Sequence, residues 1–198
     1  MLFAQKKHEI QLPDISLDGF RVNLRPPRLE DWPYWVEVRL RNHKHLKPFE
    51  PAWPKRCLSE DFFKRRLLRQ FYEWESDRGR FFLIFKEGEE SLIGGMNVNN
   101  IFRGAAQYAS LGYWIDERYE GQGYMAEALR LMIKYCFEEI GLERINAACL
   151  DYNKRSRSLL QRAGFEEEGL AKKYMQIDGR RQDHVLYGLT IEGWKKNN

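Results

Sequence analysis

The order of apolar and polar positions predicts one strand and two helices in the first third of the chain. Residues 20–25 alternate between the two kinds of side chain, as a half-buried strand does, and two prolines end this segment. Residues 29–40 have the spacing of an amphipathic helix. A second helix is expected from the N-cap residue Ser59 to about Ser76, after a proline-rich loop at residues 47–54.

Three strand-like segments follow these helices, at residues 80–86, 91–99 and 108–116. Glycine-containing turn signals at residues 87–89 and 103–104 separate them. Because these connections are short, we expect the three strands to form an antiparallel meander.

The next segment, residues 124–140, predicts a long amphipathic helix with an apolar stripe on one side and Glu127 on the polar side. Gly141 suits the left-handed conformation that commonly ends a helix. A buried type of strand at residues 144–150 comes next, and a helix is expected from the N-cap residue Asn153 through Ala163.

The last part of the chain predicts a β-hairpin. Residues 174–177 can pair with residues 184–190 around Asp178-Gly179, which is a strong turn signal. Only the strands on either side of the helix at residues 124–140 need a long crossover, so parallel pairing is expected there alone. This order predicts an α/β or α+β fold with a single mixed, mostly antiparallel sheet and helices on both faces.

Length and composition indicate one folded unit. The 198 residues and 23.8 kDa suit one domain rather than two. Aromatic residues make up 14% of the chain, which supplies enough apolar surface for a packed core despite a mean hydropathy of −0.67. The net charge of +4 is a mild excess that favours anionic partners. We expect a flexible extension at residues 1–18 and one domain at residues 19–198.

Cysteine usage and the N-terminus favour a cytoplasmic protein. Cys57, Cys136 and Cys149 are odd in number and have no metal-binding spacing, so we expect neither a disulfide framework nor a metal site. Residues 1–11 lack the apolar segment of a signal peptide, and no apolar run is long enough to cross a bilayer. We therefore expect no contact with membranes.

The clearest candidate site is a glycine loop between the strand that ends at Asp116 and the helix that starts at Tyr124. Gly121 and Gly123 allow backbone N–H groups to turn toward a ligand, and the helix adds its unpaired N-terminal donors. This arrangement favours a phosphate group. The loop lacks the Lys-Ser/Thr of a nucleotide-binding P-loop and the third glycine of a dinucleotide site, so ATP and NAD are disfavoured.

The loop Arg118-x-x-Gly121-x-Gly123 resembles the loop that binds the pyrophosphate of CoA in GNAT-superfamily N-acetyltransferases. Other motifs resemble the RimJ/RimL branch of that superfamily, the ribosomal-protein-alanine N-acetyltransferases. They are Leu111-Gly-Tyr-Trp-Ile-Asp116, Asn153-Lys-Arg-Ser156 and Arg162-Ala-Gly-Phe165-Glu-Glu-Glu-Gly169. Two further motifs point to the RimJ type, Lys47-Pro-Phe-Glu-Pro51 and Asp178-Gly-x-x-x-Asp183-His184. The resemblance spans about residues 21–190.

This resemblance implies the GNAT fold and acetyl-CoA as the co-substrate. Backbone groups of Tyr113, Trp114 and Ile115 would bind the pantetheine as an added strand, and one amide would polarise the thioester carbonyl. The remaining implied contacts come from the glycine loop and the start of the next helix. Those residues are Arg118, Tyr119, Glu120, Gly121, Gln122, Gly123, Tyr124, Met125 and Ala126.

The resemblance also assigns catalytic roles. Ser156 would reach the sulfur and protonate the leaving thiolate, and Asn153 is a further candidate contact to the cofactor. For the general base we expect Glu50, with Asp183 and His184 as rivals. Nothing in the sequence activates Cys149 as an acyl carrier, so direct transfer in a ternary complex is favoured over a ping-pong mechanism.

The implied acceptor is the N-terminal α-amine of a protein, an alanine of a ribosomal protein. Two basic stretches flank the expected substrate loop and could contact ribosomal RNA. They are Arg39, Arg41, Lys44 and Lys47, and Lys64, Arg65, Arg66 and Arg69. The alternatives are an acetyltransferase for a small amine and a CoA-binding, ribosome-associated module without turnover. The sequence does not determine the oligomeric state.

Overall fold

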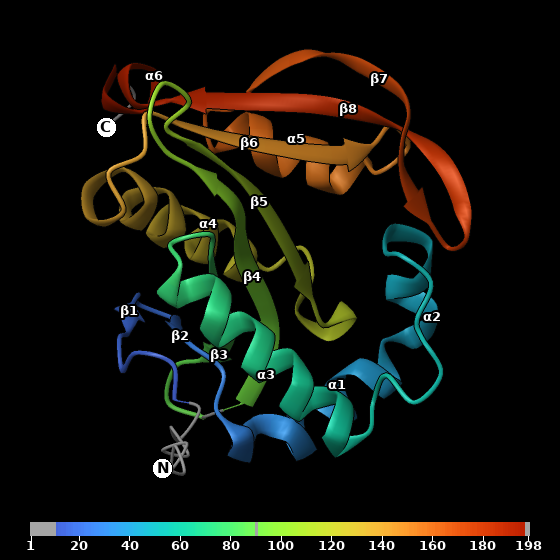
Figure 1. The fold of residues 1–198 in the computed structure, drawn as a ribbon. Coiled ribbons are helices and arrows are strands. Elements are labelled where there is room, and N and C mark those ends of the chain that lie inside the picture. The colour runs from blue at the N-terminus through green and yellow to red at the C-terminus, as the bar shows by residue number, and fades with distance from the viewer. Residues whose placement is uncertain (1–10, 90, 197–198) are drawn as a thin grey trace, which may run out of the picture.

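The computed structural model describes residues 11–89 and 91–196, and one eight-stranded sheet organises this part of the chain (Figure 1). The strand order is β1-β2-β3-β4-β5-β6-β8-β7. The strands are β1 Leu17–Asp18, β2 Val22–Arg25, β3 Gly79–Lys86, β4 Ser91–Phe102, β5 Tyr108–Ile115, β6 Arg144–Leu150, β7 Glu166–Ile177 and β8 Arg180–Thr190.

Helices fill the connections between these strands. The α-helices are α1 Trp32–Arg41, α2 His43–Leu46, α3 Glu60–Glu75, α4 Tyr124–Lys134, α5 Lys154–Arg162 and α6 Ile191–Lys196. Short 3-10 turns lie at η1 Leu29–Asp31, η2 Lys47–Phe49 and η3 Glu117–Tyr119, and a π-helical turn, η4 Tyr135–Glu139, extends α4.

The expected pairing of the strands is confirmed. Strands β5 and β6 are parallel, because α4 crosses between them, and the other neighbouring strands of the described sheet are antiparallel. The sheet is therefore mixed and mostly antiparallel, as predicted.

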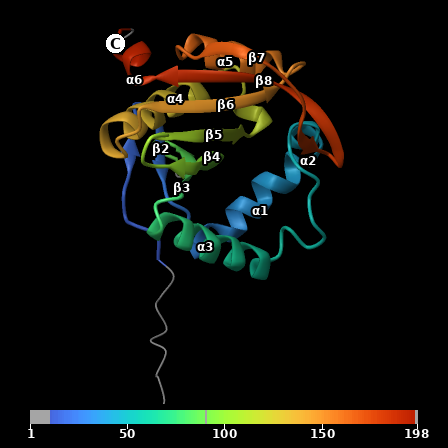
Figure 2. The same cartoon turned by 45° about the horizontal axis from the view of Figure 1, so that its top comes forward.

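Helices cover both faces of the sheet (Figure 2). On one face, α1 and α3 contribute Trp35 and Phe63 to a core with Leu83 and Phe85 of β3. On the other face, α4 and α5 contribute residues such as Leu129 to a larger core that runs across most of the strands. Each face of the sheet therefore buries its own apolar layer, which is what a sheet between two helical layers requires.

Several local signals act as the sequence predicted. The Ser59 side chain accepts a hydrogen bond from the backbone N–H of Phe62 (3.3 Å) and starts α3. Gly141 has a φ of 72° after the last turn of the helix. Asp178 and Gly179 both have positive φ, 43° and 78°, as the tight turn between β7 and β8 demands.

Other elements differ from the prediction. The hairpin is longer than expected, because β7 starts at Glu166 and β8 at Arg180. The expected proline-rich loop begins with a 3-10 turn at Lys47–Phe49, and the helix His43–Leu46 precedes it. Residues 1–10 of the expected extension lie outside the described residues. Within its remainder, Leu12 is buried against α1 and α3, and β1 pairs with β2.

The position of Glu127 corrects the predicted polar side of the long helix. Glu127 is buried, and its carboxylate accepts hydrogen bonds from the backbone N–H and the Nε of Arg21, at 2.8 and 3.0 Å. Arg21 precedes β2 and lies 106 residues away in the chain, so helical periodicity alone could not reveal this pair. The carboxylate joins the start of the sheet to the first turn of α4.

We predict that Ser59→Ala destabilises the protein by about 1 kcal/mol, because the Phe62 N–H loses its acceptor. Urea denaturation checks this value. Ser59→Asp is the matched control, since it keeps a capping oxygen and adds a favourable charge at the helix N-terminus. Equal losses in both variants would contradict the capping role.

Candidate active site

The site is built where β5 and β6 separate. Their parallel pairing runs from Tyr108 opposite Arg144 to Leu111 opposite Ala147 and then stops. Residues 112–115 remain paired with β4, and residues 148–150 remain paired with β8. The two facing strand edges are thus unpaired with each other beyond this point (Figure 1). An extended ligand with amide groups can add to such an edge as a strand does.

The predicted pantetheine-binding residues Tyr113, Trp114 and Ile115 lie on this free edge of β5. Successive side chains of a strand point to opposite faces. The Tyr113 hydroxyl reaches Ser156 at the start of α5, whereas the Trp114 indole lies beside the Arg39 guanidinium of α1, at 5.0 Å. The two side chains therefore mark the two faces of the sheet at the site.

The glycine loop leads from this edge into α4. Gly121 and Gly123 have φ values of 70° and 88°, which side chains with a Cβ rarely adopt. Gly123 is the N-cap of α4, and no side chain caps this helix. The N–H groups at its start are therefore available to an anion, together with the positive end of the helix dipole. The loop fits a pyrophosphate.

Asp116, at the end of β5, fixes the position of the glycine loop. Its buried carboxylate accepts hydrogen bonds from Arg41 Nη2 (2.7 Å) and from Arg118 Nε and Nη2 (3.1 and 3.0 Å). Burial alone would raise the pKa of Asp116, but the hydrogen bonds from Arg41, Asn42 and Arg118 outweigh burial and lower it. The Arg118 side chain thus points to Asp116 and fixes the loop.

Sequence reasoning missed Arg41 and Asn42 in this network. Arg41 is the last residue of α1 and Asn42 follows it, and each lies 75 residues before the group that it binds. The Asn42 side-chain oxygen accepts the N–H of Glu117 at 2.9 Å. A second ion-pair cluster lies at Glu120, which binds His45 of α2 (3.0 Å) and Arg155 of α5. The acidic residues of the loop therefore hold it against three helices.

Ser156 lies in the first turn of α5, where Asn153 accepts its backbone N–H at 3.1 Å. Its hydroxyl is 2.7 Å from the Tyr113 hydroxyl, across the separation of β5 and β6. Burial raises the pKa of Tyr113, so this phenol stays protonated and can donate to Ser156. Asn153 is confirmed as the cap; its contact with a cofactor remains a prediction.

Cys149 on β6 is buried next to the Ser156 hydroxyl. Burial raises the pKa of the Cys149 thiol to about 11. The thiol is therefore protonated at neutral pH, which does not suit an acyl-carrying nucleophile.

Glu50, the expected base, lies on the α1 face of the sheet but is fully engaged. Its carboxylate forms a bidentate pair with Arg39 (2.8 and 2.5 Å) and accepts the indole N–H of Trp53 at 2.9 Å. The Arg39 guanidinium in turn lies 4.4 Å from the Trp53 ring centre. A carboxylate bound by three donors is poorly placed to take a proton from an amine.

The two rival bases differ from each other. The Asp183 carboxylate accepts the backbone N–H of Lys173 at 2.7 Å, in a bulge of β7 where Lys173 has a φ of 49°. This contact shapes the hairpin. His184 is 2% exposed and pairs with Leu150 of β6, on the sheet face opposite to Cys149. That face is the one on which Trp114 meets α1.

The hydrogen bond of His184 defines its tautomer. Its Nδ1 lies 3.0 Å from the carbonyl oxygen of Gln182, which can only accept, so Nδ1 carries the proton. In a neutral imidazole, Nε2 is then an acceptor. Among the described residues, no hydrogen-bond partner occupies this nitrogen.

The hairpin and the loop after α2 meet beside these residues. The Asp178 N–H donates to the Glu50 carbonyl at 2.9 Å, and Lys47 lies 3.7 Å from the Asp178 carboxylate. The Tyr152 hydroxyl donates to the Pro48 carbonyl at 3.1 Å. These contacts bring the Lys47-Pro-Phe-Glu-Pro51 and Asp178-Gly motifs together, although more than 120 residues separate them in the sequence.

Two general features of the described chain bear on the class of site. Within residues 11–89 and 91–196, no group of three or more His, Cys, Asp or Glu side chains could hold a metal ion. No helix in the same ranges combines the length and the apolar character needed to cross a membrane.

Comparison with known proteins defines the class. A family model described as an acetyltransferase (GNAT) domain matches residues 21–166. The chain belongs to the GNAT acetyltransferase family, and is an acetyl-CoA-dependent acetyltransferase. It is 38% identical over 185 residues to the [ribosomal protein uS5]-alanine N-acetyltransferase of Escherichia coli K12, covering 92% of this chain and 94% of that protein.

Two solved structures share the fold at similar identity. Mycobacterium smegmatis RimJ in complex with CoA-disulfide is 33% identical with a TM-score of 0.82, covering 86% of this chain and 82% of that chain. The ribosomal-protein-S5-alanine acetyltransferase of Vibrio fischeri is 30% identical with a TM-score of 0.85, covering 91% and 99%. The predicted resemblance to the RimJ type is confirmed.

We predict that Asp116→Asn destabilises the protein at pH 7 by roughly 2–3 kcal/mol, because Arg41 and Arg118 lose a charged partner. The folded-state pKa of Asp116 lies below its unfolded value of about 3.9, so its contribution is present above that pH and is lost as the pH falls through the folded pKa. Urea denaturation at pH 7 and near pH 3 checks both effects. A difference between the two proteins that stays constant with pH would contradict this account.

Proposed function

We propose that this protein transfers the acetyl group of acetyl-CoA to the N-terminal α-amine of a ribosomal protein, an alanine, by direct attack. The observation that carries the proposal is the unpaired edge of β5 that leads directly into the uncapped glycine loop. This arrangement accommodates an extended amide chain followed by a pyrophosphate, which is the chemical order of groups in acetyl-CoA. The relatives named for uS5-alanine and S5-alanine acetylation support the acceptor.

In this proposal the backbone of residues 113–115 binds the pantetheine amides, and one N–H polarises the thioester carbonyl. The residues from Arg118 to Ala126 surround the pyrophosphate, with the Gly121–Gly123 backbone closest and Arg118 acting through Asp116. Backbone groups carry most of these contacts, so they tolerate changes of side chain.

Ser156 serves the leaving group. The amine nitrogen attacks the carbonyl carbon, the C–N bond forms, and the C–S bond breaks with its electron pair on sulfur. The Ser156 hydroxyl donates to this sulfur. The Tyr113 hydroxyl, 2.7 Å away, donates in turn to the serine oxygen. A thiol ordinarily has a pKa near 8.5, so the departing thiolate needs only modest stabilisation.

We assign the base to Nε2 of His184 in preference to Glu50. The tautomer leaves this nitrogen free to accept a proton from the amine, directly or through one water. Glu50 then positions the acceptor side by fixing Arg39 and Trp53. An N-terminal amine has a pKa near 7.7–8.0, so a substantial fraction of it is already neutral at cellular pH. A strong base is therefore not required.

The proposal also includes a cytoplasmic location and contact with RNA around the acceptor. Of the first basic stretch, Arg39, Arg41 and Lys47 pair with Glu50, Asp116 and Asp178. These acidic partners largely neutralise the three cations. On α3, Arg66 has no acidic partner among the described residues, so the second stretch carries the proposed contact with RNA.

Acetylation of peptides tests the acceptor. An octapeptide that begins with alanine and matches the N-terminus of uS5 from the same organism should be acetylated on its α-amine. Mass spectrometry locates the acetyl group. The same peptide with a blocked N-terminus and a free lysine is the control. Faster transfer to small amines such as polyamines would favour the alternative acceptor, and binding of acetyl-CoA without transfer would favour the non-catalytic module.

We predict that Ser156→Ala lowers kcat by about 10- to 100-fold and leaves the Kd for CoA nearly unchanged, because the hydroxyl acts on the leaving group. Gly121→Val should do the reverse, since valine resists a φ of 70° and the loop binds the cofactor. Calorimetry with CoA and initial rates separate the two effects. Parallel loss of both parameters in both variants would contradict the division of roles.

We predict that His184→Gln lowers the rate of acetyl transfer, because a glutamine amide cannot accept a proton from the attacking amine. The titratable group packed against His184 is Tyr174 of β7, with ring centres 5.8 Å apart. Asp183→Asn is the control, because its amide oxygen still accepts the Lys173 N–H. An unchanged rate in His184→Gln together with a lower rate in Glu50→Gln would restore Glu50 as the base.

A further inference from the structure

Arg66 on α3 is a half-buried cation without an acidic partner among the described residues. Within residues 11–89 and 91–196, its guanidinium has no hydrogen bond and no carboxylate within ion-pair distance. It lies 5.7 Å from the centre of the Trp35 ring. Burial and the nearby charges of Arg39 and Arg69 lower the pKa of Arg66 to about 10. An arginine that is partly removed from water usually has an acidic partner.

A surface pocket of about 120 Å³ opens beside this guanidinium, and Phe62, Arg65, Arg66 and Arg69 line it. These positions follow one another at helical spacing along one side of α3. The volume is several times the roughly 30 Å³ that a water molecule occupies in the liquid. Three guanidinium groups and one aromatic ring therefore surround one small space.

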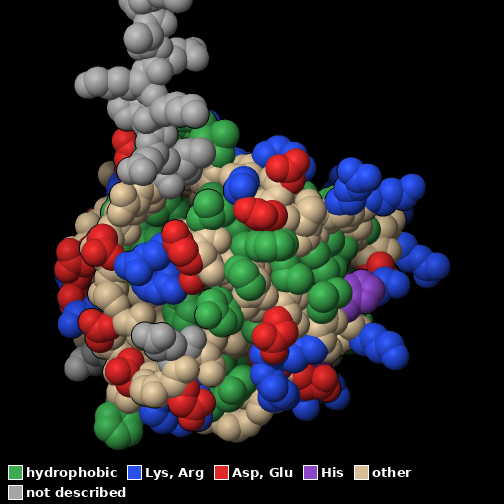
Figure 3. All heavy atoms as spheres, turned by 90° about the horizontal axis from the view of Figure 1, so that it is seen from below, with side chains coloured by type: hydrophobic (Ala, Val, Ile, Leu, Met, Phe, Trp, Pro, Cys, Tyr) green, Lys and Arg blue, Asp and Glu red, His purple; other side chains and the backbone are tan. Residues whose placement is uncertain are grey.

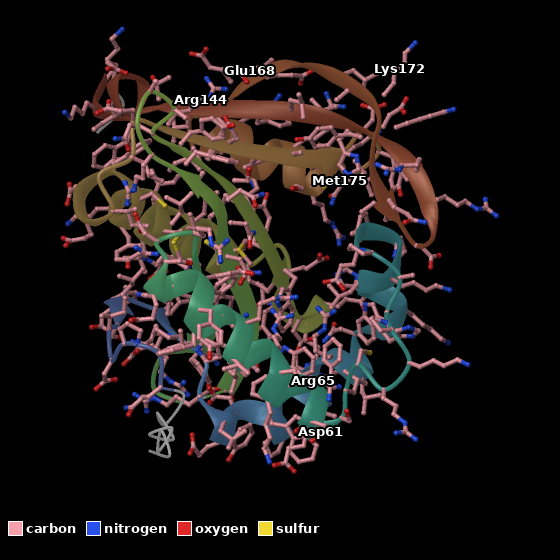
Figure 4. The ribbon with its side chains drawn as sticks, viewed as in Figure 1. Asp61, Arg65, Arg144, Glu168, Lys172 and Met175 are labelled. Atoms are coloured by element: carbon pink, nitrogen blue, oxygen red, sulfur yellow. The ribbon has the colours of Figure 1, made fainter. Side chains whose placement is uncertain are left out.

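The two outer arginines are held loosely. Arg65 lies 3.6 Å from Asp61 and Arg69 lies 3.6 Å from Glu73, with about two thirds of each arginine side chain exposed, 67% and 65%. Figure 4 labels Asp61 and Arg65 in the first turns of α3. Exposed pairs of this kind contribute little to stability, so both side chains can turn toward a ligand at small cost.

This face of the molecule has the composition of a docking surface. Figure 3 shows it from the side of α1 and α3, with hydrophobic side chains gathered in the middle, Lys and Arg side chains concentrated along one edge, and Asp and Glu side chains interspersed elsewhere. The pocket adjoins the acceptor side through α1, because Trp35 and Arg39 lie one turn apart and Arg39 lies beside Trp114.

We infer that Arg65, Arg66 and Arg69 form a phosphate-binding site for the backbone of single-stranded RNA, with Phe62 as a stacking platform. A phosphodiester supplies the charge that the structure does not give Arg66, and guanidinium groups bind its two free oxygens in a bidentate manner. The aromatic side chain in the lining favours a nucleic acid over an acidic peptide, because a base can stack on it. The choice of RNA rests on the proposed ribosomal acceptor, since RNA is the polyanion that surrounds such a protein.

The test measures binding of a fluorescent 12-nucleotide RNA by anisotropy as salt is raised. Arg66→Met should weaken binding roughly tenfold or more and reduce the slope of log Kd against log salt by about one. Arg130→Met, which removes an exposed cation on the opposite face of the sheet, is the matched control and should leave both values unchanged. Unchanged RNA binding in Arg66→Met, or an equal loss in both variants, would overturn the inference.

Thermal unfolding separates a binding role from a structural one. Removal of an unpaired, half-buried charge should raise the Tm of Arg66→Met. Inorganic phosphate should raise the Tm of the wild type but not that of the variant. A lower Tm in Arg66→Met together with intact RNA binding would show that the arginine is structural, and this would contradict the site.

Two further measurements keep this inference separate from the proposed function. Arg66→Met should acetylate the free uS5 peptide at the wild-type rate, because the pocket lies outside the reacting groups. If the wild type fails to acetylate this peptide, the proposed function fails, whereas the RNA site is judged by anisotropy alone. A further outcome is that a glutamate-rich peptide displaces the labelled RNA as effectively as unlabelled RNA does at equal ionic strength. That result would identify an acidic protein, and not RNA, as the partner of the site.

Discussion

The end of pairing between β5 and β6 is the constraint on which the site depends. Each strand is fully held on its outer side, β5 by β4 and β6 by β8, so the two can diverge without losing the sheet. The divergence leaves backbone donors and acceptors of residues 112–115 without a strand partner on one side. Unpaired backbone groups are costly when buried. A ligand with peptide-like amides therefore completes the sheet while it binds.

Buried carboxylates keep this arrangement rigid. Asp116 joins the end of β5 to α1 through Arg41, and Glu127 joins the first turn of α4 to the chain before β2 through Arg21. Arg21 also donates to the carbonyl of Gln122 at 3.0 Å. The glycine loop is thus held from both ends, while the N–H groups of residues 121–123 have no hydrogen-bond partner within the described part of the chain. Most of the basic residues near the loop serve these internal pairs, which leaves the uncompensated charge at Arg66 as the exception on α3.

Local signals in the sequence were sufficient for much of this structure. The cap at Ser59, the turn at Asp178-Gly179 and the single parallel pair each follow from a few neighbouring residues or from the length of one connection. Strand β7 was only partly found, because its first half is exposed and polar and does not alternate. Arg144 of β6 binds Glu168 there, and Figure 4 shows the pair between the strands. Such a partner becomes visible only when distant strands are brought together.

The candidate site shows the same limit at the level of single side chains. The glycine loop and Ser156 follow from motifs, whereas the state of Glu50 depends on Arg39 and Trp53, which only the fold places against it. The proposed preference for His184 over Glu50 as the base therefore rests on contacts between residues that are distant in the sequence.

Alternation along the strands then divides the chemistry between the two faces of the sheet. Tyr113 and Cys149 point toward Ser156 and α5, where the proposed mechanism places the leaving sulfur. Trp114 and His184 point to the opposite face, beside α1 and the hairpin, where the proposed mechanism places the attacking amine. In this proposal the thioester lies between β5 and β6, with Ser156 on the side of the leaving sulfur and His184 on the side of the amine. Because the period of a strand is two, a shift of one residue in the register of β5 or β8 would exchange these faces and abolish the division.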